Sequence, residues 1–204
     1  MNYEESKKSV ILLGSGPEWQ TCPYDREVWM VAKLAMMHKH KRIDRVFNMD
    51  QIDEMLTWKM EQFKTLFTKD EFIAKMNTLA VPFITSFPEE RIAHTQIFPL
   101  KEINERWGLT YYTNTICFMI ALALYEGYES ISLYGVAQGG QLEYMKERKG
   151  VEFWLGLAAG MGVKIEILTH SNLMRNDGDK LYGYGMSADD IMKKLYGIEG
   201  EKQG

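Results

Sequence analysis

The sequence is poor in the features that define several common classes of protein. Cysteine occurs only at Cys22 and Cys117, with no Cys-x-x-Cys or Cys/His cluster, which argues against a zinc site or a disulfide framework. The net charge of -4 leaves no basic field to hold a nucleic-acid backbone. The longest apolar stretch, Ile116 to Tyr125, is too short to cross a bilayer, and the N-terminus is too polar for a signal peptide. We therefore expect a cytoplasmic protein with no nucleic-acid or membrane partner.

The composition is that of an ordinary globular chain with alternating structural patterns. It has 204 residues, of which 46% are hydrophobic and 25% charged, enough to bury a core. Buried strands are predicted where Val, Ile and Leu run together, and helices where apolar residues recur at helical spacing. The predicted strands are 9–14, 44–50, 81–87, 94–100, 129–136 and 163–169, and the predicted helices are 25–40, 51–63, 69–80, 113–128, 150–162 and 187–197.

This alternation predicts an α/β fold, a Rossmann-like three-layer sandwich with a mainly parallel sheet. Asp25 is the expected cap of the helix at 25–40, with Val28 and Leu34 on its apolar stripe. Gly127 and Gly162 stand where helix-to-strand turns need a left-handed residue. We expect a nucleotide-binding domain over 1–170 and a C-terminal extension with a short helix over 171–204.

A glycine turn follows the first predicted strand. In "ILLGSGPEWQ", Trp19 stands where a dinucleotide fingerprint needs its third glycine, and no Lys-Ser or Lys-Thr follows to make a Walker loop. Gly14, Ser15, Gly16 and Pro17 can still present backbone N–H groups at close range, because glycine has no Cβ to obstruct a ligand. We expect this turn to hold a negatively charged small molecule; the alternative is a plain turn that ends the strand.

Polar residues also follow the second predicted strand. Asn48 and Asp50 alternate, so both are expected to project to one side as the strand ends. An acidic or amide group at this place often binds a ribose hydroxyl or a base. Alternatively, Asp50 caps the helix predicted from Gln51.

The apolar helix at 113–128 begins with Thr113, Asn114 and Thr115. The free N–H groups and the positive dipole end at the N-terminus of a buried helix lie in apolar surroundings of low dielectric constant, and such a helix end favours binding of an anion. A simple N-cap by Thr113 or Asn114 is compatible with that role.

Further candidates follow the strand at 129–136 and the strand at 163–169. The first group is Gln138, Tyr144, Glu147 and Arg148, in a stretch that either folds over the pocket or forms a solvated helix face. His170 follows the last strand, where it is either a base that titrates near neutrality or a structural residue.

Two segments resemble known families. "ILLGSGPEW" is similar to the G-x-G-P-S opening of the MptE-like 6-hydroxymethylpterin diphosphokinases and of the sialyltransferases that use CMP-sialic acid. In both families a polar turn, an apolar helix and a strand ending in G-x-D come later, and Thr113 to Ala137 resembles that segment. "EFWLGLAAGMG" is similar to a helix of small uncharacterised phage proteins.

The resemblance implies that Gly14 to Pro17 bind nucleotide phosphates, that Asn48 touches sugar or base, and that Thr113 to Thr115 lie near the transferred group. The sequence departs from the families at two positions: Glu18 replaces a serine, and Ala137 replaces the acidic residue of G-x-D. The loop after the strand at 129–136 also lacks the histidine that the sialyltransferases use as a base.

Two functions follow from these residues. The first is binding of a nucleotide-derived phosphate ligand without turnover, by a protein that senses or sequesters it, in the host cytoplasm if the protein is phage-encoded. The alternative is nucleotide-dependent glycosyl or diphosphoryl transfer, with His170 or Glu147 as the base. The sequence identifies no cofactor and no metal site, and the apolar helix and the tail offer surface for a homodimer.

Overall fold

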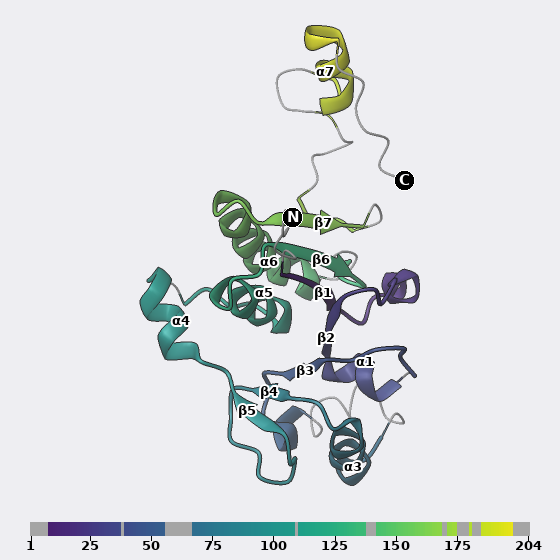
Figure 1. The fold of residues 1–204 in the computed structure, drawn as a ribbon, viewed down its shortest axis with the longest axis vertical. Coiled ribbons are helices and arrows are strands. Elements are labelled where there is room, and N and C mark those ends of the chain that lie inside the picture. The colour runs from purple at the N-terminus through teal and green to yellow at the C-terminus, as the bar shows by residue number, and fades with distance from the viewer. Residues whose placement is uncertain are drawn as a thin grey trace, which may run out of the picture. The chain divides into compact units, whose positions relative to one another are not determined.

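The computed structural model describes residues 8–37, 39–55, 67–108, 110–137, 142–168, 171–174, 180 and 185–197. The chain divides into two compact units, Met1–Ser171 and Asn172–Gly204. Figure 1 shows the sheet and helices of the first unit and the short helix of the second.

The first unit is built on a seven-stranded sheet with the order β5-β4-β3-β2-β1-β6-β7. Its strands are β1 (Ser9–Leu13), β2 (Glu27–Val31), β3 (Arg45–Asn48), β4 (Phe83–Thr85), β5 (Thr95–Ile97), β6 (Ser130–Tyr134) and β7 (Lys164–Ile167). Every neighbouring pair runs parallel, which confirms the predicted α/β class.

The strand order reverses beside β1. From β1 the chain adds β2, β3, β4 and β5 in sequence on one side, and then returns to place β6 and β7 on the other. Because all strands are parallel, the turns after β1 and β6 meet at the same edge of the sheet. This is the switch point of an open α/β sheet, outside which ligands of such folds usually bind.

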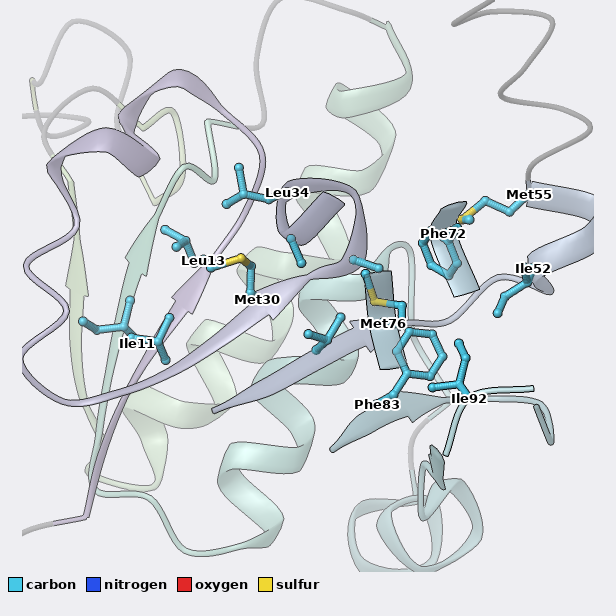
Figure 2. Packing of buried hydrophobic residues seen from close by; sticks show 14 of the residues in the cluster. Ile11, Leu13, Met30, Leu34, Ile52, Met55, Phe72, Met76, Phe83 and Ile92 are labelled. Carbon is cyan, nitrogen blue, oxygen red and sulfur yellow. The ribbon is translucent and has the colours of Figure 1, made fainter. Parts of the chain in front are cut away.

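One face of the sheet is covered by α1 (Ala32–Met37) and α3 (Lys69–Leu79). Ile11 and Leu13 of β1 point to this face, in one apolar cluster with Met30 of β2. Phe72 and Met76 of α3 belong to the same cluster, and Figure 2 shows them close to Phe83 of β4.

The opposite face is covered by α5 (Thr115–Tyr125), which contacts β1, β2 and β3. Next to it lie α4 (Leu100–Trp107) and α6 (Leu142–Gly160), and α6 also contacts β7. Figure 1 shows α5 and α1 on opposite sides of the strands. Since α5 packs on three strands and also contacts α4 and α6, most of it is buried, which explains its continuous apolar sequence.

The predicted helix at 25–40 is wrong in its first part, where the chain forms β2 before α1. Val28, Trp29 and Met30 are fully buried in a strand paired on both sides, and this tertiary environment overrides the apparent helical stripe. Asp25 caps no helix and instead forms an ion pair of 3.0 Å with Arg26.

Other local predictions agree with the structure. Gly127 and Gly162 have φ of 77° and 79°, the left-handed conformation expected after a helix. α3 lies within the predicted helix at 69–80, and it starts at a capping box between Thr68 and Glu71 that was not predicted. The helix predicted at 51–63 is helical at 52–55, and its remainder lies outside the described residues. α4 was not predicted, and α6 begins at Leu142, before the predicted Gly150.

The second unit contains α7 (Ala188–Tyr196), within the predicted helix at 187–197. The Ser187 side chain caps it by accepting a hydrogen bond from the Asp190 N–H, and Gly197 ends it with φ 65°. No helix in the described part of the chain is both long enough and apolar enough to span a membrane.

Candidate functional site

The glycine turn after β1 is joined to the turn after β6 by backbone hydrogen bonds. The Gly14 N–H donates to the Tyr134 carbonyl at 2.8 Å, and the Gly16 N–H donates to the Gly135 carbonyl at 2.8 Å. A Cβ on Gly14 would lie 2.5 Å from the Gly135 oxygen, and one on Gly135 would lie 2.5 Å from the Gly14 oxygen. The glycines are therefore needed because two backbones approach closely.

This pairing corrects the expectation that the turn presents free amides to an anion. The N–H groups of Gly14 and Gly16 are already used within the protein, and Pro17 has none. Ser15 is exposed and has no hydrogen-bond partner among the described residues. Of the four residues of this turn, only Ser15 still offers a free N–H and a hydroxyl to a ligand.

Asn48 and Asp50 lie at the end of β3 but differ in exposure. Asn48 is 5% exposed, and its side-chain amide donates to the Asp50 carbonyl at 2.6 Å, which closes the turn after the strand. The Asp50 side chain is exposed, so the two side chains lie in different environments. Asn48 thus stabilises the turn that positions Asp50.

Asp50 lines a hollow of about 350 Å³ beyond the ends of β3 and β4. Its walls are Asp50, Gln51, Ile52, Asp53, Thr85, Phe87, Pro88, Glu89, Glu90 and Arg91. The Arg91 guanidinium binds Glu89 at 2.5 Å and Asp53 at 3.2 Å, and its hydrogen bonds lower the pKa of Glu89. Because carboxylates outnumber Arg91 in these walls, the hollow is poorly suited to a phosphate.

The predicted residues at the start of α5 come together with Glu147 of α6. Asn114 caps α5, with its side-chain oxygen accepting from the Cys117 N–H at 3.2 Å, and its amide donates to Glu147 Oε2 at 3.1 Å. The Thr113 hydroxyl donates to the Glu147 carbonyl at 2.6 Å. Gly150 makes this contact feasible, because any Cβ there would collide with Thr113.

The positive end of α5 therefore already has a carboxylate close by. Glu147 reaches it through Asn114, and a negative charge is favourable at a helix N-terminus. Thr115, the first residue of α5, is partly exposed. Cys117 lies one turn further in, where burial raises the pKa of its thiol and keeps it protonated.

Aromatic packing holds the segment that leads into α5. The Tyr112 ring stacks on Phe118 of α5 at 4.3 Å and on Trp154 of α6 at 5.2 Å between ring centroids. The Tyr112 hydroxyl donates to Asn104 of α4 at 3.0 Å, and burial raises its pKa to about 12. The position of Thr113 and Asn114 is thus fixed from three helices.

The remaining predicted site residues either belong to a helix surface or lie outside the described part of the chain. Arg148 forms an ion pair of 2.6 Å with Glu152 on the same helix, as a solvated helix face does. Tyr144 belongs to α6, but its side chain lies outside the described part of the chain. Gln138 and His170 lie outside it with all their atoms. Within the described residues, no group of three or more His, Cys, Asp or Glu side chains is arranged to hold a metal ion.

Two features of the site were not assigned from the sequence. Gly135 lies near the end of the predicted strand at 129–136, and its close contact with Gly14 was not predicted. Glu18 was noted only as a departure from a family pattern, yet its carboxylate lies against Gly16 in the same turn.

The fold defines an α/β protein with a parallel sheet and a Rossmann-like arrangement of helices. No protein-family model and no curated protein sequence matches the chain. The chain is similar to the sialyltransferase CstII from Campylobacter jejuni in complex with cytidine-5'-monophosphate, with 16% identity and a TM-score of 0.47, over 83% of this chain and 86% of that one. It is also similar to CstII in complex with CMP-3FNeuAc, with 16% identity and a TM-score of 0.46, over 79% of this chain and 80% of that one.

Proposed function

We propose that this protein binds a nucleotide or a nucleotide-derived small molecule at the carboxyl edge of its sheet, in front of the turn after β1. The observation that carries the proposal is the reversal of strand order between β1 and β6, with Ser15 exposed at that point and without a partner among the described residues. Parallel α/β sheets usually bind ligands there, because the chain leads away from the two strands in opposite directions along the sheet, here from β1 toward β2 and from β6 toward β7.

The start of α5 supports the same edge of the sheet as the ligand site. Helices that follow one parallel strand and precede the next run back along the sheet, so their N-termini lie at the carboxyl edge. Asn114 and Glu147, from α5 and α6, add an amide and a carboxylate that can orient a polar ligand. A site made of turns and helix ends around an apolar core is typical for small-molecule ligands.

The test is calorimetric titration with CMP, chosen because the sequence resembles the sialyltransferases that use CMP-sialic acid. Ser15→Phe fills the space in front of the turn and should weaken CMP binding by about tenfold or more, a loss equivalent to about 1.4 kcal/mol. Its thermal unfolding should not change, because Ser15 is exposed and makes no hydrogen bond with the described residues. Gln96→Phe, on the exposed edge strand β5, is the matched control and should bind CMP as the unchanged protein does. Unaltered binding by Ser15→Phe would place the ligand elsewhere.

The Asn114–Glu147 contact favours a second candidate function, nucleotide-dependent transfer. In that reaction Glu147 would take the proton from an acceptor hydroxyl, the acceptor oxygen would bond to the transferred group, and the bond to the nucleotide phosphate would break. With CMP-sialic acid as the probe and a sugar hydroxyl as the acceptor, release of CMP should then stop in Glu147→Gln while CMP still binds. Recovery of intact CMP-sialic acid after incubation with the unchanged protein would instead favour a protein that senses or sequesters its ligand.

A further inference from the structure

Glu18 holds a buried oxygen that has no hydrogen-bond partner. The residue lies in the short 3-10 helix η1 (Pro17–Thr21), directly after the glycine turn. Its Oε2 atom is shielded from solvent and is without a hydrogen bond in the part of the chain that the structure describes. This oxygen lies only 3.1 Å from the place where a Cβ on Gly16 would be, so the carboxylate lies against the turn.

Among the described residues, no donor near Glu18 forms a hydrogen bond with Oε2. The N–H of Gly16 donates to Gly135, that of Trp19 donates to Gly16, and Pro17 has none. The Thr21 hydroxyl donates to the backbone carbonyl of Glu18, not to its carboxylate. A buried carboxylate oxygen without a donor is costly in free energy, and such groups are rare enough in folded proteins to need an explanation.

A carboxylate at this point also determines what can approach the turn. An ionised carboxylate only accepts hydrogen bonds, so a favourable partner must donate. A phosphate donates poorly and carries like charge, whereas sugar hydroxyls and the amino groups of bases are donors. The same residue that makes the turn unsuitable for phosphate therefore makes it suitable for the neutral part of a nucleotide.

We propose that Glu18 is a specificity-determining residue, which accepts a hydrogen bond from a hydroxyl or amino group of the ligand. This inference rests on the proposed function and deepens it: the turn after β1 contacts the nucleoside, and the phosphate is bound away from it. Because Oε2 is shielded against Gly16 in this structure, the Glu18 side chain turns toward the ligand on binding, and the donor of the ligand then removes the cost of the unpartnered oxygen.

The test compares cytidine with CMP as calorimetric probes for the unchanged protein, Glu18→Gln and Glu18→Ser. We expect cytidine to bind the unchanged protein measurably, because the turn contacts the nucleoside, but more weakly than CMP, because the phosphate is bound at a separate place. Both variants should bind cytidine about tenfold more weakly or worse, the loss expected for a hydrogen bond to a charged acceptor. Glu18→Ser, which removes the like charge, should also raise the preference for CMP over cytidine.

Glu105→Gln is the matched control, since it makes the same chemical change at an exposed residue of α4. It should leave both affinities unchanged, and thermal unfolding of each variant shows that it is folded. The inference is overturned if the Glu18 variants bind cytidine and CMP as the unchanged protein does, while Ser15→Phe still weakens CMP binding. If the unchanged protein binds neither probe, the proposed function and this inference fall together.

Discussion

Substitution of Gly14 by alanine tests whether the turns after β1 and β6 depend on close backbone contact. The added Cβ would lie 2.5 Å from the Gly135 oxygen and 3.0 Å from a methyl carbon of Val136, so the two turns must move apart. Separation weakens the hydrogen bonds from Gly14 to Tyr134 and from Gly16 to Gly135, each worth about 1 kcal/mol. Overpacking of a well-packed region adds about 1–3 kcal/mol. We expect the free energy of unfolding to fall by about 3 kcal/mol in total.

Urea denaturation at 25 °C measures this loss directly. Gly156→Ala is the control, because Gly156 lies inside α6 with no atom within 4 Å of an added Cβ. Alanine has the higher helix propensity, so this variant should gain about 0.5–1 kcal/mol. The φ of Gly14 is not in the left-handed region, so backbone strain adds nothing to its loss. A Gly14→Ala variant within about 1 kcal/mol of the unchanged protein would refute the argument for close packing.

Two further predictions concern the helices behind the site. Gly150→Ala should lower the free energy of unfolding, measured by urea denaturation, by about 1–3 kcal/mol, because the added Cβ collides with Thr113. Adding Thr113→Ala to this variant should restore part of the loss. If the losses of the two single variants simply add, the contact is contradicted. Burial raises the pKa of Tyr112 to about 12 in the folded protein, against about 10 in the unfolded chain. The contribution of Tyr112 to the free energy of unfolding is therefore complete below pH 10 and is lost as the pH rises to about 12. Tyr112→Phe should therefore reduce the alkaline loss of stability by about 3 kcal/mol, and an unchanged pH profile would show that Tyr112 is not the group responsible.

The parts of the fold that depend on local chemistry could be predicted from the sequence. The capping box at Thr68, the left-handed Gly127 and Gly162, and the apolar run of α5 each depend on residues close together in the chain. β2 could not be predicted in this way. Its residues fit a helical stripe as well as a strand, and only burial between β1 and β3 selects the strand.

The candidate site was harder to predict because its contacts join distant segments. Asn114 and Glu147 were both proposed as candidates, but they are separated by 33 residues and nothing in the sequence pairs them. The glycines after β1 were predicted to let a ligand approach closely, but the group that approaches them is the backbone at Gly135. The glycine spacing indicates that another group approaches the backbone closely, and only the order of the strands in the sheet identifies that group.

The order of the strands also has a consequence for how the chain is assembled during synthesis. Strands β2 to β5 follow β1 along the chain, so this half of the sheet can pair strand by strand as it leaves the ribosome. The other edge of β1 has no partner until Ser130–Tyr134 has been made, and the glycine turn is completed only then. A nascent chain stopped before that point would expose an unpaired parallel edge at the centre of the future sheet, which is an opening for aggregation.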